Sequence, residues 1–224
     1  MKNNTHQTFS IILNSLIVIL TVFASYAIFN SFEFMGHSGF AENAPHFKIF
    51  KYFTVDSNIF AGIVSLIFLI YYLTKKNKES ILPKPLFLLK LAATTGVTLT
   101  MMVTVFYLGP KSDEGYFALF MNASLIMHLI TPLLCIISFV FFEKTKKNSK
   151  RLSITGIIPM LLYSVFYISN IFMHLKNNKT SRTYDLYGFL DGGLQFTWIV
   201  IPLIFGITWF FAFSLLALNK KCNC

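Results

Sequence analysis

The sequence predicts an all-α membrane protein in which residues 1–224 form one bundle of six transmembrane helices. Its composition is 55% hydrophobic and only 12% charged, whereas soluble domains carry about 25% charged residues. Six apolar segments are each long enough to cross a bilayer, which takes about 20 residues. The basic residues gather between these segments, which is typical of the connections in a multi-pass membrane protein.

The six helices are expected to follow one another along the chain. The first is preceded by one basic residue, Lys2, and its apolar core is longer than that of a signal peptide, so we expect it to remain as a transmembrane helix. The connections after the first and fifth helices are long enough to contribute a lid or part of a site. The helices are expected near residues 9–30, 52–74, 86–108, 117–142, 154–175 and 196–218.

The distribution of lysine and arginine predicts the orientation. Twelve of them lie at the two ends of the chain and in the second and fourth connections, and six lie in the other connections. By the positive-inside rule, both termini are then cytoplasmic. Lys90 remains, near the expected cytoplasmic end of the third helix, where its long stem can reach the interface. Because topology accounts for the net charge of +10, we expect no binding to nucleic acid.

Polar residues at the start of the second helix are the first functional candidates. Thr54, Asp56, Ser57 and Asn58 lie within five residues of one another, and polar groups inside a membrane are costly unless they find partners or do work. Thr54 and Asn58 are four residues apart and share one helix face. The alternative interpretation is helix packing, because small and hydroxyl-bearing residues let membrane helices approach closely.

The fourth and fifth helices supply the other candidates. On the fourth, His128 lies on a polar face with Ser124, and a hydrogen bond to a neighbouring helix is the alternative to a catalytic role. The fifth helix carries polar and aromatic residues at i, i+4, i+7 and i+11, a spacing that predicts one face turned into the bundle and lining a cavity. An aromatic belt at the membrane surface is the alternative. These residues are Tyr163, Tyr167, Asn170 and His174.

These candidate residues can form two kinds of functional site. In the first, Thr54 is a nucleophile and neutral His128 its general base, as in acyl transfer by a hydroxyl and an imidazole, with Asn58 as the oxyanion donor. In the second, His128 holds a metal or haem together with His174, His37 or His46. No HxxxH or CxxC spacing supports the second, so we expect neither a metal nor another cofactor.

Three short motifs resemble one known family. The run Lys51-Tyr52-Phe53-Thr54-Val55-Asp56 resembles a motif of the androgen-induced and androgen-dependent membrane proteins, which are multi-span threonine hydrolases of fatty acid esters of hydroxy fatty acids. Its extension to Asn58 is closer still to the motif of bacterial relatives. Met127-His128 followed by Pro132 is similar to the family's histidine segment. Leu186-Tyr187-Gly188-Phe189-Leu190-Asp191 resembles a Tyr-Pro-Phe-Leu-acidic motif, with glycine in place of the proline.

The resemblance implies a hydrolase of lipid (fatty acyl) esters in a bacterial cell membrane, with Thr54 as nucleophile and His128 as its partner. A further relative is an acyltransferase for phospholipids, so a lipid acyltransferase using the same residues is one alternative. A non-enzymatic membrane protein, such as a small transporter or a partner subunit, is another. The expected partners are the bilayer and a lipid or fatty acyl ester. The expected substrate contacts are Asn58, Ser124, Tyr167, Asn170, His174 and Asp191.

Overall fold

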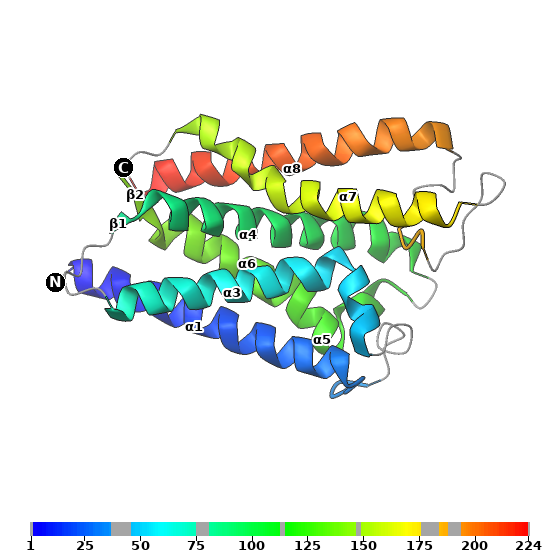
Figure 1. Ribbon diagram of the computed structural model, residues 1–224. Helices are drawn as coiled ribbons and strands as arrows, with labels where there is room; N and C mark the ends of the chain where they lie inside the picture. The colour runs from blue at the N-terminus through cyan, green and yellow to red at the C-terminus, as the bar shows by residue number, and fades with distance from the viewer. Residues whose placement is uncertain are drawn as a thin grey trace.

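A computed structural model describes residues 2–36, 46–74, 81–112, 115–146, 149–175, 184–187 and 194–223. Its described residues contain six helices that are long and apolar enough to cross a membrane, so the all-α fold and the predicted number of long apolar helices are confirmed. The first helix begins and the last helix ends at the same end of the bundle (Figure 1). We call this the terminus end, and the opposite one the far end.

Three of the spans are single α-helices, and the other three combine α-helix with tighter or wider turns. The single helices are α1 (Lys2–Phe29), α3 (Phe53–Thr74) and α8 (Leu194–Asn223). The third span is α4 (Lys84–Val103), followed by η2 (Thr104–Leu108) and η3 (Gly109–Lys111). The fourth is α5 (Asn122–Leu125), η5 (Ile126–Ile130), α6 (Thr131–Ile137) and η6 (Ser138–Phe142). The fifth is η7 (Lys150–Ile157) and α7 (Ile158–Met173).

Short elements join the spans at both ends of the bundle. At the far end, the 3-10 helices η1 (His46–Lys51) and η4 (Tyr116–Phe120) precede the second and fourth spans. At the terminus end, β1 (Ile81–Leu82) pairs in parallel with β2 (Lys144–Thr145), with Ile81 opposite Lys144. This two-residue bridge ties together the chain before the third span and the chain after the fourth.

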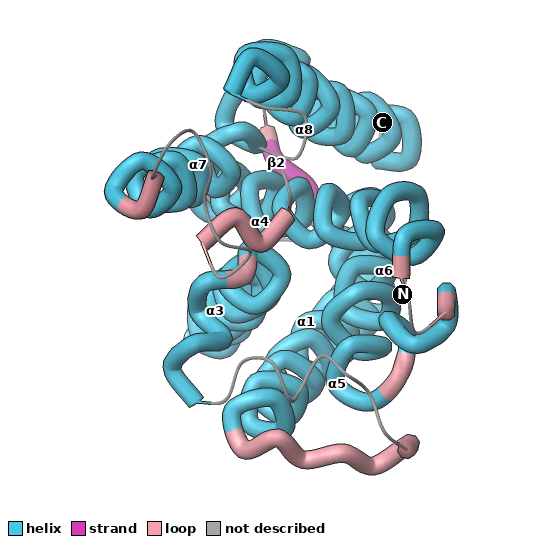
Figure 2. Tube along the Cα trace, turned by 90° about the vertical axis from the view of Figure 1, so that its right-hand side faces the viewer, coloured by secondary structure: helices cyan, strands magenta, loops and turns pink. Residues whose placement is uncertain are grey.

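The third span is the centre of the bundle. In the end-on view, α4 has α1 and α3 on one side and α7 and α8 on the other (Figure 2). Three of its threonines remain compatible with burial because their hydroxyls donate to carbonyls one turn earlier in the same helix: Thr95 to Leu91, Thr98 to Thr94 and Thr100 to Gly96. The outer spans instead expose large apolar side chains such as Ile19, Leu162 and Leu203, which suits a surface that faces lipid.

The fourth span starts later than the sequence predicted. We expected a helix from Phe117, but the chain is extended at Met121 and turns at Asn122, whose φ is +52°. Asparagine tolerates this left-handed conformation better than most residues. Its side chain also accepts the N–H groups of Phe34 and Met35 at 2.7 and 2.5 Å, so the connection after α1 holds this turn in place.

The fifth and sixth spans meet at one point and then diverge. A Cβ on Gly156 of η7 would lie 2.4 Å from Cβ of Ala212 on α8 and 2.9 Å from Oγ1 of Thr95 on α4, so only glycine fits where the three helices cross. From this crossing α7 and α8 separate towards the far end (Figure 1). A cavity lies between them in this half of the bundle.

Candidate functional site

A cavity of about 520 Å³ lies between α4, α7 and α8 in the far half of the bundle. The first turn of α3 contributes Phe53 and Thr54 to its wall, and Lys111 and Tyr107 lie at its outer rim, with Lys111 Nζ 4.1 Å from the Tyr107 ring centroid. Most of the wall is apolar, which suits an apolar ligand with few polar anchors. The polar lining residues of the inner wall are Thr54, Thr100, Thr104, Tyr163, Ser164, Tyr167 and Tyr187.

Thr54 and Thr104 are the two threonines of this wall whose hydroxyls make no hydrogen bond with the described residues. The side chain of Thr54 is only 7% exposed. Its backbone N–H also makes no hydrogen bond with the described residues. The neighbouring N–H groups do find partners: those of Val55 and Asp56 donate to the carbonyl of Tyr52, and that of Phe53 donates to the hydroxyl of Tyr187. The first N–H groups of an α-helix have no intrahelical partner. Thr54, which lines the cavity, therefore has both a hydroxyl and an N–H without a partner among the described residues.

Tyrosines hold the turn that carries Thr54. The hydroxyl of Tyr187 accepts the Phe53 N–H at 3.1 Å, and the hydroxyl of Tyr163 donates to the carbonyl of Lys51 at 2.7 Å. The Tyr163 ring also packs on Phe53, with centroids 5.1 Å apart. These contacts join the fifth span and residues 184–187 to the start of α3, so the position of Thr54 depends on three parts of the chain.

Residues 184–187 are anchored by a buried acid. The hydroxyl of Tyr167 donates to Oδ1 of Asp185 at 2.5 Å, and the N–H of Tyr187 donates to the Tyr167 oxygen at 3.3 Å. Asp185 is 3% exposed, a degree of burial that is expensive for a carboxyl without partners. Burial also raises the pKa of Tyr187 to about 12, so its phenol stays neutral and keeps accepting from Phe53.

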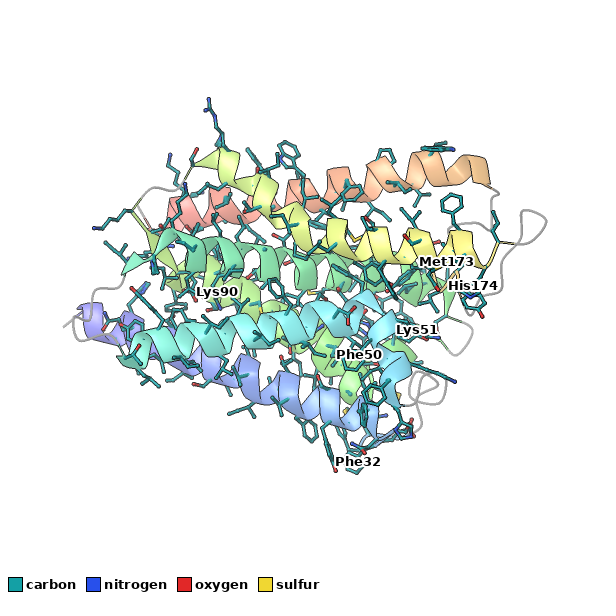
Figure 3. The ribbon with its side chains drawn as sticks, viewed as in Figure 1. Phe32, Phe50, Lys51, Lys90, Met173 and His174 are labelled. Carbon is teal, nitrogen blue, oxygen red and sulfur yellow. The ribbon has the colours of Figure 1, made fainter. Side chains whose placement is uncertain are left out.

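The fifth span turns only part of its predicted polar face inward. Tyr163 and Tyr167 are buried in the cavity wall, and Asn170 is half-buried outside the lining. His174 is exposed at the end of α7, where its ring stacks on Tyr184 with centroids 3.7 Å apart (Figure 3). The expectation that His174 faces the interior is wrong, because α7 ends at Met173 and His174 lies beyond its last turn.

His128 is buried in the neighbouring fourth span and is not part of the cavity lining. It is 2% exposed and lies within the π-helical segment η5, a conformation often found at functional sites. Its Nδ1 is 3.1 Å from the carbonyl oxygen of Leu119. A neutral ring that donates from Nδ1 carries its lone pair on Nε2. The arrangement thus leaves Nε2 as the basic nitrogen.

Asn58 connects the helix of Thr54 to the segment of His128. Its Nδ2 donates to the carbonyls of Thr54 at 2.8 Å and Met127 at 3.0 Å. In a π-helix the Met127 carbonyl would accept from the residue five positions on, but this is Pro132, which has no N–H. Asn58 takes over that role. Both of its N–H groups are used, so none is left for the oxyanion role that we expected.

The hydrogen bond between Asn58 and the Met127 carbonyl shows how far apart Thr54 and His128 lie along the bundle axis. Thr54 lies one turn from Asn58 towards the far end, and His128 lies one residue beyond Met127 towards the terminus end. At 1.5 Å per residue the offset is about 7 Å along the helix axes. Side chains lean towards the N-terminus of their helix, which is the far end for both helices. The ring of His128 therefore leans towards the level of Thr54.

The remaining predicted contacts fall outside the cavity or outside the described chain. Ser124 is 3% exposed on α5 and does not line the cavity. Asp191 lies outside the described residues, as does His37. Within the described ranges, no group of three or more histidine, cysteine, aspartate or glutamate side chains could hold a metal ion.

The sequence prediction missed a buried ion pair at the terminus end. Lys90 does not reach the interface as expected but points into the bundle (Figure 3), with Nζ 2.5 Å from Asn14 Oδ1 and 3.6 Å from Glu143 Oε1. Ser138 Oγ donates to the same carboxylate oxygen at 2.9 Å. Lys90 and Glu143 are 2% and 0% exposed. Asn14, in the middle of an apolar helix, was the available signal for this cluster.

No family model, curated protein or solved structure matches this chain. The class of protein is therefore defined by the structure alone. It is an all-helical protein with six helices of membrane-spanning length and apolarity and a mostly apolar cavity between them. The wall of that cavity carries two threonine hydroxyls, those of Thr54 and Thr104, that have no partner among the described residues.

Proposed function

We propose that the protein is a membrane-embedded hydrolase of fatty acyl esters, with Thr54 as nucleophile and His128 as general base. The observation that carries this proposal is the Thr54 hydroxyl, buried in an apolar cavity wall without a hydrogen bond to any described residue. A buried polar group normally finds a partner. One that has none is available to a ligand, and a hydroxyl beside a base is the usual nucleophile of acyl transfer.

The shape of the cavity supports an acyl chain as that ligand. Its walls from α7 and α8 are apolar, and they include Leu203 and Ile207, which are also exposed on the outer surface of the bundle. The cavity thus opens at the surface where lipid would lie. A fatty acyl chain can then enter sideways from the bilayer, and burial of its methylenes would contribute about 0.8 kcal/mol each.

The start of α3 supports the charge that develops in the reaction. The unpaired N–H of Thr54 belongs to the positive end of the helix dipole and lies on the residue that would attack. Hydrolases often use the N–H of the nucleophile itself as one oxyanion donor. We assign this role to the Thr54 N–H instead of the Asn58 amide, whose two N–H groups are bonded elsewhere.

The proposed reaction has two steps. The Thr54 oxygen attacks the ester carbonyl while its proton passes to Nε2 of His128, directly or through one water. That proton then goes to the alcohol oxygen as the ester bond breaks, which leaves an acyl-threonine. A water molecule attacks this second ester, and His128 takes its proton and returns it to the Thr54 oxygen. The products are a fatty acid and an alcohol.

The membrane setting follows from the same proposal. In the sequence, twelve lysines and arginines lie in the chain ends and the second and fourth connections, against six in the other connections. We therefore place the terminus end in the cytoplasm and the cavity in the outer half of the cell membrane. The resemblance of residues 51–58 and of the His128 segment to the threonine hydrolase family supports the choice of Thr54 and His128.

Variants of Thr54 and a matched threonine test the proposal. Purified protein in detergent is assayed with a panel of fatty acyl esters and with an acyl-directed fluorophosphonate probe. Thr54→Ala and His128→Ala should each lower turnover by about 10³-fold or more, and the double variant should be no worse than either. Thr54→Ser should keep part of the activity. Thr104→Ala removes another hydroxyl of the same cavity wall and should leave turnover within about threefold, since Thr104 has no part in the mechanism.

Two outcomes would change the assignment. Turnover that survives in Thr54→Ala against every ester removes threonine from the mechanism. Turnover that requires an added lipid alcohol makes the protein an acyltransferase using the same residues.

A transporter is the second candidate, and the buried Lys90–Glu143 pair favours it, because intramembrane charges often mark ion paths. Between that pair and the far half, however, Ile17, Val64 and Val97 belong to a cluster of buried apolar residues, which offers no polar path for an ion. Absence of both labelling and turnover would put the transporter first.

A further inference from the structure

One face of α1 carries polar residues on both sides of the buried Ile17. Its polar residues follow one another at spacings of three, four, seven and four, which places them on one side of the helix. Four of the five are less than 9% exposed, and Ser25 is half-buried, so the face points into the bundle and not towards lipid. These residues are Gln7, Ser10, Asn14, Thr21 and Ser25.

In the far half of the bundle, this face meets other buried polar atoms that have no partner. Among the described residues, no hydrogen bond is made by Oγ1 of Thr21, Oγ of Ser25, Oδ1 of Asn58 or Oγ1 of Thr131. Asn58 and Thr131 are both fully buried. An unpaired buried polar atom is costly, and native proteins leave few of them. Four on three adjacent helices call for a common explanation.

Helix contacts bring the four atoms into two neighbouring layers. A Cβ on Gly62 of α3 would lie 2.9 Å from Cγ2 of Thr21, so Gly62 and Thr21 are level. Asn58 on α3 and Ser25 on α1 each lie one turn from this contact towards the far end, because the two helices run in opposite directions. These two residues form the first layer.

The fourth span supplies the remaining member. Asn58 is bonded to the carbonyl of Met127, so these two residues are level. Gly62 lies one turn from Asn58, and Thr131 one turn from Met127, in both cases towards the terminus end. Thr131 is thus level with Thr21, and the two form the second layer, about 6 Å from the first. Met127 and Cys135, one turn either side of Thr131, both pack against α1 and α3, so Thr131 faces the same helices.

We propose that Thr21, Ser25, Asn58 and Thr131 form a buried water site between α1, α3 and α6. Hydroxyl groups both donate and accept, whereas Asn58 Oδ1 only accepts, so the ligand must be able to donate and to accept. Water meets this need, and buried waters typically join two to four such groups. A cation fits less well, because none of the four groups carries a negative charge to offset its burial.

The water site does not rest on the proposed function, although it lies near the proposed base, His128. Thr131 is three residues from His128 on the same span, so the site would place internal water within one turn of the proposed base. Lys90 and Glu143 lie beyond the apolar layer formed by Ile17, Val64 and Val97. The water site is therefore separate from the ion pair.

The direction of a stability change tests the site. Valine has the shape of threonine without the hydroxyl. If Thr131 is bonded to water, Thr131→Val loses that bond and should lower the melting temperature by about 2–4 °C. If the hydroxyl is dry and unpaired, the same change removes a penalty and should raise it. Thr21→Val should behave in the same way. Thr98→Val is the control, because its hydroxyl already donates to its own helix, so its loss should change the melting temperature little.

A second measurement keeps the proposal testable if a variant folds poorly. Short X-ray pulses generate hydroxyl radicals from bound water, which oxidise adjacent side chains. In the native protein Met127, 1% exposed, should be oxidised despite its burial. Thr21→Val/Thr131→Val should reduce this oxidation several-fold, while Met160, which lines the cavity instead, should be unchanged.

The site is overturned if Met127 resists oxidation in the native protein and Thr131→Val raises the melting temperature. The melting temperature should be the same in sodium chloride and in choline chloride. A higher melting temperature in sodium chloride would assign the site to a cation and would also overturn the proposal.

Discussion

The two ends of the bundle bury polar groups in opposite ways. At the far end, the Thr54 hydroxyl lies in an apolar wall without a bond to any described residue. At the terminus end, the Lys90 ammonium and the Glu143 carboxylate share a network of short contacts with Asn14, Ser65 and Ser138. The Thr54 hydroxyl is available to a ligand, whereas Lys90 and Oε1 of Glu143 are bonded within the protein, although Oε2 of Glu143 has no partner among the described residues.

This difference separates reactivity from stability. A charged pair in a low-dielectric interior is tolerated only when its members are well bonded, and the network draws on four spans, so it sets how those helices meet. A single unpaired hydroxyl costs far less and constrains no helix. We therefore expect the terminus end to govern whether the protein folds and the far end to govern what it does.

Breaking the ion pair should have the largest effect on stability. Glu143→Gln leaves the Lys90 charge buried and unpaired, which should lower the free energy of unfolding by about 3–5 kcal/mol. Thr54→Ala removes only an unbonded hydroxyl and should change the free energy of unfolding by less than about 1 kcal/mol. Denaturant unfolding in detergent would measure both.

The double variant Lys90→Met/Glu143→Met provides the control. It replaces the pair with apolar side chains and should recover most of the loss. If Glu143→Gln proves as mild as Thr54→Ala, the ion pair does not hold the helices together.

A smaller effect is expected at the crossing that separates the two ends. Gly156→Ala places a methyl group against Ala212 and Thr95, which should cost about 1–3 kcal/mol through overpacking and shift α8 relative to α7. Ligand binding in the cavity should weaken with it, as measured by labelling at Thr54.

Gly206→Ala on α8 is the matched control. A Cβ there meets nothing within 4 Å, so the variant should be neutral or more stable by about 0.5–1 kcal/mol. Equal losses in the two variants would show that the helix crossing is not tight.

A modest effect is expected from the tyrosine that holds the start of α3. Tyr187→Phe removes the acceptor of the Phe53 N–H and should cost about 0.5–1.5 kcal/mol of stability. Activity should fall more steeply than stability, because Thr54 follows Phe53 directly. An unchanged rate in Tyr187→Phe would mean that Thr54 keeps its position without this bond.

The smallest effect is a change in pH dependence. Burial raises the pKa of the Tyr187 phenol to about 12, above the value of about 10 in an unfolded chain. The neutral form is thus favoured by folding, so this contribution is complete below pH 10 and is lost as the pH rises from about 10 to about 12. Tyr187→Phe should flatten that part of the stability curve. Absorbance of phenolate in the two proteins would show whether one tyrosine titrates late.

The sequence by itself determined the class of fold and the local candidates. Each span is a continuous apolar run, so its existence depends only on residues next to one another in the chain. Thr54 and His128 could be singled out in the same way, as polar residues within such runs. Their mutual depth could not, because it depends on Asn58 and Met127 being bonded across two helices.

The tertiary structure alone decided which polar groups find partners. Lys90 and Glu143 are 53 residues apart and each lies near the end of its own span, where a charged residue normally reaches the interface. Only the packing of α1, α3, α4 and the fourth span turns both side chains inward and supplies Asn14 as a shared partner. The physical reason is that the cost of a buried charge depends on the atoms around it, and those atoms come from helices that the local sequence does not relate.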